Sequence, residues 1–417
     1  MSSLRLIEYQ PRLNVPLSKD EVDRLRRLGS AITVTPSLEQ EGCYDLTPGS
    51  WVGVIDLGDR YVEIWPKIPM DRLLFLISYA LDRRGWRETV TGLAAAPSLY
   101  EAVVLAFAAL VRRAIGRGLL HGYRTEDDAL QAVRGRIRFD DQLRYRFGRL
   151  PPAEVRFDEF TADIEENRML KAALIRLRQM RLWSERARRE LRTLQSAFEP
   201  VSLVHYDARA LPEITYTRLN EHYEPAVELA RLILRSTSYE LRRGRHSALA
   251  FLVDMNQVFE DFVAVALRDA LGLPPHAFPR QVQGRRLYLD EGRRVRLYPD
   301  LSWWDGSRCL VVGDVKYKAL LGDDVVHADL YQLLAYTIAT DVPGGFLIYA
   351  AGEATEVDYT AAHLGKVLRV MTLDLAGLPR QILAQVQRIA NEVRELARRS
   401  GADVPRPMPS AVSAVAR

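Results

Sequence analysis

The sequence has few cysteines, and their number excludes several kinds of site. Its 417 residues include two, Cys43 and Cys309, which lie far apart and lack the spacing of zinc ligands. Two cysteines also cannot supply a four-cysteine iron–sulfur cluster or a disulfide-based scaffold. We expect both to be small apolar residues in a reducing compartment.

Long apolar runs are absent as well. No stretch of about 18 consecutive apolar residues, the length that a membrane-spanning helix requires, occurs in the sequence. The N-terminus also lacks the charged and apolar regions of a signal peptide. We therefore expect a cytoplasmic protein with no membrane partner.

Two further absences concern nucleotides and charge. The nearest match to a phosphate-binding loop, Gly365-Lys366, continues with Val367 and has Thr360 in place of the first glycine, so nucleotide hydrolysis would require another chain. The 58 basic and 54 acidic residues give a net charge of only +4. This charge is modest for a nucleic-acid binder, and it implies either local basic patches or delivery by a partner.

The length and composition are those of a multidomain globular protein. Hydrophobic residues make up 48% of the 417 residues, and a chain of this length predicts two or three domains of α+β or α/β class. We expect a β-rich region at 1–95, a mainly helical region at 96–245, a mixed sheet flanked by helices at 246–399, and a disordered tail at 400–417.

The first two regions contain clear signals for individual elements. Trp51–Leu57 and Tyr61–Pro66 predict a hairpin around Gly58-Asp59, and a helix is expected over Met70–Leu81. Leu99–Ile115 is almost uniformly apolar, as a buried helix would be. The polar, Arg-rich stretch Tyr123–Arg149 is either a contact region for a partner or nucleic acid, or an ordinary solvated surface.

Two carboxylates and a lysine form the most informative pattern. Asp300 ends the run Tyr-Pro-Asp, and Asp314 and Lys316 stand two residues apart. The surrounding sequence predicts two strands, Arg296–Trp303 and Arg308–Val315, so the aspartate and the lysine emerge on one strand face. Aspartates supply the hard oxygen ligands that Mg²⁺ or Mn²⁺ prefers, and a lysine beside them can orient water and pair with phosphate. The pattern P-D-x(13)-D-x-K resembles that of the PD-(D/E)xK nuclease superfamily.

Predicted helices flank the two strands. A helix over Phe251–Ala270 carries Glu260, and a second over Asp329–Ala339 carries Gln332 and Tyr336 four residues apart on one face. This order of elements is similar to that of RecB-like members of the superfamily. The resemblance implies a catalytic set of Asp300, Asp314, Lys316 and Glu260, with Gln332 and Tyr336 as auxiliary residues.

Two more residues complete the candidate site. The Val315 carbonyl is expected to join Asp300, Asp314 and Glu260 around the metal, with Glu260 acting directly or through water. Lys318 follows the catalytic strand as either a phosphate contact or a solvated lysine.

The geometry of the hairpin tests whether Asp300 and Asp314 can lie on one face of the sheet. A two-residue turn at Asp305-Gly306 would pair Asp300 with Val311 and turn Asp314 to the opposite face of the sheet. Placing both acids on one face requires an odd-length loop, a β-bulge, or strands that splay and shift. The sequence leaves the choice among these three open.

Several phrases along the chain, of which the last two contain the acid–lysine pattern, are similar to the McrC family, the nuclease subunit of McrBC-type modification-dependent restriction systems. The resemblance covers about residues 50–340, and it depends on the joint order of the phrases. They are Val62-Glu63-Ile64-Trp65-Pro66-Lys67-Ile68-Pro69, Arg134-Gly135-Arg136-Ile137, Asp158-Glu159-Phe160-Thr161, Glu166-Asn167-Arg168-Met169-Leu170-Lys171, Asn256-Gln257-Val258-Phe259-Glu260, Pro299-Asp300-Leu301 and Asp314-Val315-Lys316-Tyr317-Lys318.

The resemblance implies a division of labour. A separate McrB-like AAA+ GTPase hexamer binds GTP, recognises modified DNA and translocates. The McrC-like chain docks on it through residues 1–95, stimulates GTP hydrolysis and cuts DNA, in defence against phage. Arg60, Lys67 and Arg72 are candidates to approach the GTPase, because an arginine supplied in trans can stabilise the transition state of phosphoryl transfer.

Two alternatives compete with this interpretation. The first is a stand-alone RecB-like exonuclease or repair nuclease with the same active site and no GTPase partner. The second is a non-catalytic adaptor that keeps the nuclease fold for docking and GTPase activation. The presence of Asp300, Asp314 and Lys316 argues against the adaptor, and a neighbouring gene for an AAA+ GTPase would argue against the stand-alone enzyme.

Overall fold

The computed structural model describes residues 3–58, 60–81, 98–179, 184–208, 210–236, 249–279, 286–317, 327–350 and 356–401. The chain folds as two compact units. The first combines Met1–Gly53, Arg60–Ala94 and Leu252–Arg417, and the second holds Val54–Asp59 and Ala95–Phe251. The expected mixed α and β multidomain class is confirmed. None of the helices in the described ranges is long and apolar enough to span a membrane.

Two small sheets begin the chain. In the four-stranded sheet of order β1-β6-β5-β10, β1 and β6 run parallel. The expected hairpin strands, β5 and β6, are therefore neighbours, as predicted. A second sheet has the order β2-β4-β3 and is antiparallel. The elements are β1 (Ser3–Ile7), β2 (Arg12–Pro16), α1 (Lys19–Arg26), β3 (Ile32–Pro36), β4 (Cys43–Pro48), β5 (Trp51–Asp56), β6 (Tyr61–Trp65) and β10 (Leu249–Asp254).

The N-terminal and C-terminal segments of the first unit share one hydrophobic core. Helix α2 spans Met70–Leu81, as predicted, and it packs against α9, Met255–Leu271. The rings of Phe75 and Phe262 meet edge to face, with centroids 5.4 Å apart. Such aromatic pairs stabilise a core beyond the area that they bury. The β-rich N-terminal region is therefore built onto the helix that carries Glu260.

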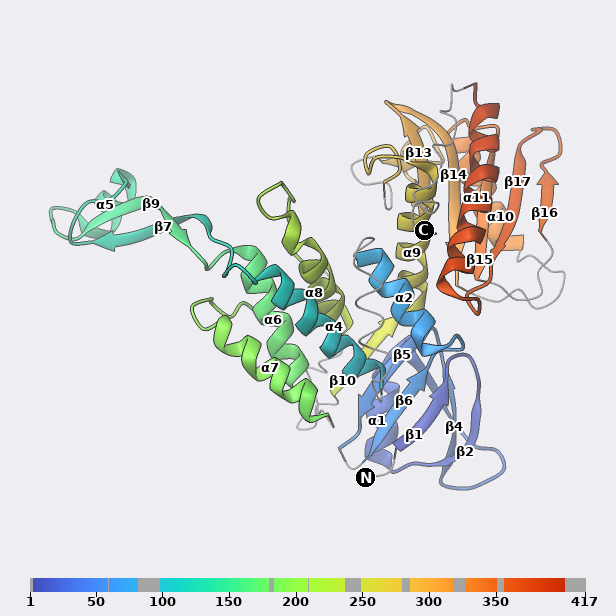
Figure 1. The fold of residues 1–417 in the computed structure, drawn as a ribbon, viewed down its shortest axis with the longest axis horizontal. Coiled ribbons are helices and arrows are strands. Elements are labelled where there is room, and N and C mark those ends of the chain that lie inside the picture. The colour runs from blue at the N-terminus through green and yellow to red at the C-terminus, as the bar shows by residue number, and fades with distance from the viewer. Residues whose placement is uncertain are drawn as a thin grey trace, which may run out of the picture. The chain divides into compact units, whose positions relative to one another are not determined.

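A five-stranded sheet forms the centre of the C-terminal part, in the order β13-β14-β15-β17-β16. Strand β13 is antiparallel to β14, β15 runs parallel to both β14 and β17, and β16 is antiparallel to β17. Helices α10 and α11 pack on this sheet, and Figure 1 shows α11 in red lying across it. The elements are β13 (Leu301–Asp305), β14 (Arg308–Lys316), α10 (His327–Ala339), β15 (Gly344–Ala350), β16 (Val357–Thr360), β17 (Val367–Leu373) and α11 (Pro379–Arg399).

Two predicted elements need correction. The helix expected over Phe251–Ala270 begins only at Met255, because the apolar run before it forms β10 and the Asp254 carboxylate caps the helix by accepting a hydrogen bond from the Asn256 N–H. A short apolar run does not by itself distinguish a buried strand from a helix. The strand expected over Arg296–Trp303 is interrupted around Pro299, which has no N–H for a ladder. Its first part, β12 (Arg296–Leu297), pairs with β11 (Leu287–Tyr288) instead.

The second unit is a helical bundle that carries a β-sheet arm. The bundle contains α4 (Leu99–Ala114), α6 (Glu165–Gln179), α7 (Glu185–Ala197) and α8 (Glu224–Ser236). In the arm, β7 (Gly122–Leu130) pairs along its whole length with β9 (Ala153–Thr161), and β8 (Arg136–Ile137) and α5 (Phe139–Arg146) lie between them in sequence. Figure 1 shows β7 and β9 as a long extension with α5 at its far end.

Candidate functional site

A β-bulge in the hairpin β13–β14 places Asp300 and Asp314 on one face of the sheet. Asp305 pairs with Arg308, which leaves only Gly306 and Ser307 in the turn, and the register shifts between Trp303 and Trp304. Beyond the shift, Leu301 pairs with Gly313. Asp300 precedes Leu301 and Asp314 follows Gly313, so the two acids stand opposite each other on one face. A bulge is one of the three solutions that the sequence left open.

The two acidic strand ends are joined by a hydrogen bond. Oδ2 of Asp300 accepts from the Val315 backbone N–H over 2.9 Å. The Asp314 side chain is only 2% exposed. Burial raises the pKa of Asp300, and the negative charges of Asp314 and Glu260 raise it further. Carboxylates crowded into a buried site favour either a shared proton or a bound cation.

Lys316 reaches across this site. Its Nζ lies 2.5 Å from Oδ2 of Asp314 and donates a hydrogen bond to Oε1 of Gln332 over 3.2 Å. Burial lowers the pKa of Lys316, but the carboxylates of Asp314, Asp300 and Asp329 together more than offset this effect, so the pKa is raised overall. The ammonium therefore stays charged at neutral pH and retains donors for further partners.

Residues of helix α10 continue this series of polar contacts. Gln332 and Tyr336 lie one turn apart, and Nε2 of Gln332 donates to the Tyr336 hydroxyl over 2.6 Å. The Tyr336 hydroxyl in turn donates to the carbonyl oxygen of Tyr298 over 3.0 Å. The chain of contacts thus runs from Asp314 through Lys316 to the segment that precedes Asp300.

The predicted site residues converge to different degrees. Asp300, Asp314, Lys316, Gln332 and Tyr336 are joined by direct contacts or share one face, as described above. Glu260 is half-buried on α9, and its charge acts on Asp300. Lys318 lies outside the described residues. Within the described ranges, no three His, Cys, Asp or Glu side chains form a group that could hold a metal ion.

One residue of the site was missed from the sequence. Asp329 is 7% exposed on α10 and accepts a hydrogen bond of 2.6 Å from the Tyr349 hydroxyl. Its charge also contributes to the raised pKa of Lys316. Asp329 stands three residues before Gln332, and this spacing on a helix could have indicated a shared face.

Other polar groups near the N-terminus are engaged within the chain. Arg60 forms an ion pair with Glu21, with Nε 2.5 Å from Oε1. Arg72 donates to the carbonyl oxygen of Gly377. Nζ of Lys67 lies 4.4 Å from the centroid of the Tyr317 ring. These three cations were candidates to approach a GTPase, and their contacts give each one a role inside the first unit.

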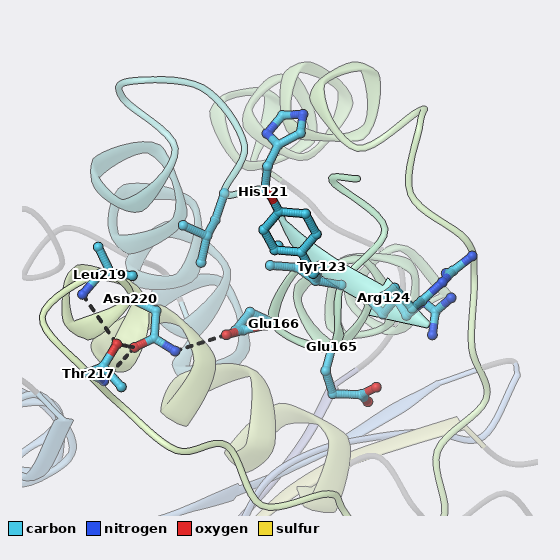
Figure 2. Close-up of a pocket in the computed structure, with 12 residues that line it drawn as sticks. His121, Tyr123, Arg124, Glu165, Glu166, Thr217, Leu219 and Asn220 are labelled. Atoms are coloured by element: carbon cyan, nitrogen blue, oxygen red, sulfur yellow. Dashed lines mark hydrogen bonds between the residues drawn. The ribbon is translucent and has the colours of Figure 1, made fainter. Parts of the chain in front are cut away.

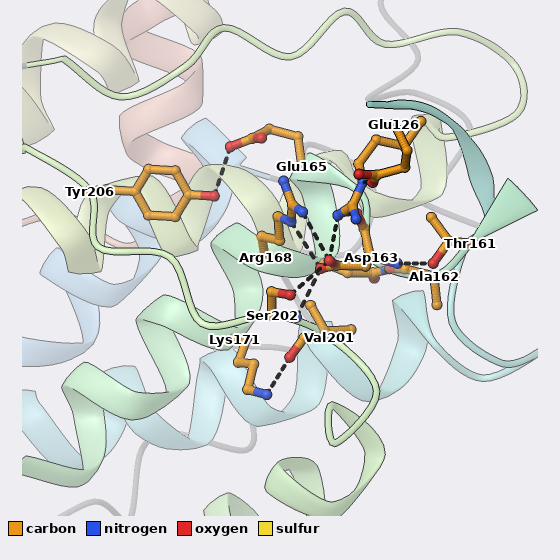
Figure 3. Close-up of polar contacts among 12 residues, drawn as sticks. Glu126, Thr161, Ala162, Asp163, Glu165, Arg168, Lys171, Val201, Ser202 and Tyr206 are labelled. Atoms are coloured by element: carbon orange, nitrogen blue, oxygen red, sulfur yellow. Dashed lines mark hydrogen bonds and ion pairs between the residues drawn. The ribbon is translucent and has the colours of Figure 1, made fainter. Parts of the chain in front are cut away.

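Two family-like phrases of the second unit, 158–161 and 166–171, lie at the base of the arm, whereas the phrase at 134–137 lies toward its far end. Asp163, 7% exposed, accepts hydrogen bonds from Arg124 of β7, Arg168 of α6 and both N–H and hydroxyl of Ser202 (Figure 3). Asn167, fully buried, donates to the carbonyl oxygens of Leu120 and Ala162. These contacts fix the arm to the bundle, so the phrases have a structural role here.

An open groove lies beside this base. Figure 2 shows Tyr123 and Arg124 of the arm together with Glu166 and Asn220, and Asn220 donates to Oε1 of Glu166 over 3.0 Å. The groove mixes acidic and basic groups and contains no acid–lysine arrangement like that of β14. The contact of Asp314 with Lys316 lies in the first unit.

The family of the chain follows from its sequence match. Residues 46–350 match the model of the McrBC 5-methylcytosine restriction system component. This match spans well over half of the 417 residues, and the chain belongs to that family. No significant match was found among curated protein sequences.

Two solved structures align with this chain, and the first has a similar fold. A chain of the half-complex from a tetradecameric assembly of Thermococcus gammatolerans McrB AAA+ hexamers with bound McrC aligns with a TM-score of 0.52 and 18% identity, covering 94% of this chain and 100% of that one. The McrBC complex of the same organism aligns at 20% identity with a TM-score of 0.43, covering 65% of this chain and 88% of that one.

Proposed function

We propose that this protein is the DNA endonuclease subunit of a GTP-dependent, modification-dependent restriction complex, with a PD-(D/E)xK active site. The observation that carries the proposal is the placement of Asp300 opposite Asp314, with Lys316 2.5 Å from Asp314 on the same strand end. An acid pair of which Asp314 is buried and Asp300 half-buried, beside a charged lysine, is suited to phosphodiester hydrolysis.

The donor set fits a divalent cation. Asp314 is buried and Asp300 is half-buried. Desolvation raises the pKa of Asp300, the charges of Asp314 and Glu260 raise it further, and a cation between the two acids would relieve that repulsion. All available donors are oxygens, which favour Mg²⁺ or Mn²⁺ over Zn²⁺. Two carboxylates and the Val315 carbonyl would hold the ion, and Glu260 would act through water. When bound, the ion supplies charge stabilisation at the reacting phosphate.

The residues of the chain have distinct parts in the reaction. Lys316 is placed to orient the attacking water and to pair with a phosphate oxygen. Gln332 holds the Lys316 ammonium through its side-chain oxygen, and Tyr336 holds Gln332. Positioning of this kind reduces the entropy that the reacting groups must lose in the transition state. Hydrolysis then forms a new bond from the water oxygen to phosphorus and breaks the bond to the leaving sugar oxygen.

The partner is an AAA+ GTPase hexamer of the McrB type, as in the assembly to which the fold is similar. The arm offers a docking surface, because it exposes a concentration of large apolar side chains. They are Tyr123, Val133, Phe139, Leu143, Tyr145, Phe147, Leu150 and Phe160. Exposed apolar patches of this kind mark interaction sites. The expected docking through residues 1–95 stays a prediction beside the docking surface proposed here on the arm.

The function is tested by reconstituting the protein with its AAA+ GTPase and 5-methylcytosine-containing DNA. Cleavage should require Mg²⁺ or Mn²⁺, GTP and the partner, and chelation should stop it. Cleavage without partner and GTP would identify a stand-alone nuclease. Stimulation of GTP hydrolysis with no cleavage under any of these conditions would identify an adaptor.

A further inference from the structure

A buried carboxylate from the first strand contacts the end of the catalytic strand. Glu8, which follows β1, is 1% exposed. Its Oε1 accepts two hydrogen bonds of 2.7 Å, one from the Tyr317 hydroxyl and one from the Lys67 backbone N–H. Tyr317 is the residue directly after Lys316, and it is 2% exposed. The bond thus joins residues 309 positions apart in the sequence.

The ring of Tyr317 is held on more than one side. Nζ of Lys67 lies 4.4 Å from its centroid, in the arrangement of a cation–π contact. The ring of Phe259 lies 5.8 Å away, and Phe259 precedes Glu260 on α9. Tyr317 therefore lies between the N-terminal sheet and the helix that carries Glu260, next in sequence to Lys316.

Burial of the Glu8 carboxylate carries a free-energy cost. Its pKa is raised by burial, which the hydrogen bonds from Lys67 and Tyr317 offset only in part. An apolar residue of similar size would avoid that cost, so stability alone does not explain a carboxylate at this position. What the carboxylate provides is a directional contact to the Tyr317 hydroxyl, which fixes the ring along its long axis.

We propose that Glu8 is a positioning residue for DNA cleavage. By holding the Tyr317 hydroxyl, it fixes the end of β14 so that Lys316 meets Asp314 and Gln332. The N-terminal strands β1 and β6 thereby become part of the catalytic support. This inference rests on the proposed nuclease function and adds to it a residue that neither contacts the substrate nor belongs to the acid–lysine pattern.

The test uses the full-length protein reconstituted with its GTPase. Tyr317→Phe removes only the hydroxyl and keeps the ring on Phe259 and Lys67, and Glu8→Leu removes the acceptor. Each should lower the single-turnover cleavage rate about ten- to a hundredfold, because small displacements of catalytic groups cost about this much. The double variant should be no slower than the worse single variant, since both remove one contact. Glu8→Gln keeps a side-chain oxygen as acceptor and should restore most of the rate.

A matched control separates positioning from general stability. Tyr79→Phe removes a hydroxyl that donates to Asp269 over 3.3 Å in the same unit, and it should leave the cleavage rate unchanged. Thermal melting, DNA affinity and GTPase stimulation are measured on every variant. A positioning role predicts a loss of cleavage rate with DNA affinity and GTPase stimulation retained.

The outcomes distinguish the inference from the function on which it rests. If the wild-type complex cleaves DNA and folded Tyr317→Phe cleaves at the same rate, Glu8 has no positioning role. If cleavage, GTPase stimulation and melting temperature fall together in Tyr317→Phe, the contact is structural and the inference is wrong. If the wild-type complex does not cleave at all, the proposed function fails, and this inference fails with it.

Discussion

Asp300 and Val315 are joined side chain to backbone, with Oδ2 of Asp300 accepting the Val315 N–H over 2.9 Å. This bond ties the start of β13 to the residue between Asp314 and Lys316. The bond thereby holds together two acids that are separated in the sequence, so that they form a single site.

The first prediction concerns the lysine and its support. Lys316→Arg should not restore the cleavage lost in Lys316→Ala, because a planar guanidinium cannot reproduce the compact ammonium that meets both Asp314 and Gln332. Gln332→Ala should lower the rate about tenfold, the effect of losing a hydrogen bond to a charged group worth about 1.5 kcal/mol.

Gln385→Ala is the control for Gln332→Ala. Gln385 also lies on a helix and accepts a hydrogen bond, from the Asp374 N–H over 2.9 Å, but it belongs to α11. Cleavage rates of the two variants, measured under single-turnover conditions, should differ about tenfold. Equal rates would remove Gln332 from the site.

A second prediction concerns protons and metal. The pKa of Asp300 is raised to about 9, first by burial and then by Asp314, so at pH 7 without metal its carboxyl group is protonated. A divalent cation requires the carboxylate, and binding should therefore release about one proton at pH 7. Metal affinity should rise with pH up to about 9. Calorimetry in buffers with different protonation enthalpies measures the release, and a value near zero would contradict the assignment.

The third prediction concerns the strand that carries Asp314. A methyl group at Gly313 would lie 2.5 Å from the ring of Phe346 on β15, well inside contact distance. Gly313→Ala should lower the free energy of unfolding by about 1–3 kcal/mol through overpacking, and it should slow cleavage. Adding Phe346→Leu should recover part of both losses by making room.

Gly116→Ala serves as the control for Gly313→Ala, because its added methyl would be 3.4 Å from its nearest neighbour. Denaturant unfolding and cleavage should be close to wild type in this variant. If Gly313→Ala is equally well tolerated, the close approach of β14 and β15 at this position is wrong.

The fourth prediction concerns the arm. Tyr123 and Phe160 pair across β7 and β9 with 78% and 60% of their surfaces exposed, and their rings lie 5.2 Å apart. Exposed aromatic residues are common centres of binding energy in interfaces. Replacing both with serine should weaken stimulation of the GTPase at least about tenfold while the protein stays folded. Leu13→Ser, at a residue that is 58% exposed on β2, is the control and should have no effect. Full stimulation by the double variant would place docking elsewhere.

Local sequence patterns predicted many helices and strands well, but they did not predict features that depend on contacts between distant residues. Met70–Leu81 was found at its predicted bounds, because a strong apolar stripe and a proline just before it define a helix. The break at Pro299 was missed because the proline, which cannot donate to a ladder, was included in the predicted strand. The change from β10 to α9 at Asp254 was missed because a continuous apolar run fits either element. The bulge in β13–β14 was one of three open solutions, because register depends on packing that the sequence does not display.

The site shows the same division. Asp300, Asp314, Lys316, Gln332 and Tyr336 were predicted as a set from the resemblance and the local spacing, and the contacts among them lie within one hairpin and one helix or between the two. The contact of Glu8 with Tyr317 could not be predicted, because no local pattern relates residues 309 positions apart. Tertiary folding alone brings them together.

The most direct test of the central claim compares Asp314→Asn with Asp305→Asn in the reconstituted complex. Asp305 ends β13 in the same hairpin and is exposed, so its variant changes one charge outside the site. With metal, GTP and partner present, Asp314→Asn should lower cleavage of 5-methylcytosine-containing DNA at least about a hundredfold, because it removes a carboxylate ligand. GTPase stimulation should remain, and Asp305→Asn should cleave normally. Cleavage by folded Asp314→Asn at the wild-type rate would contradict the account.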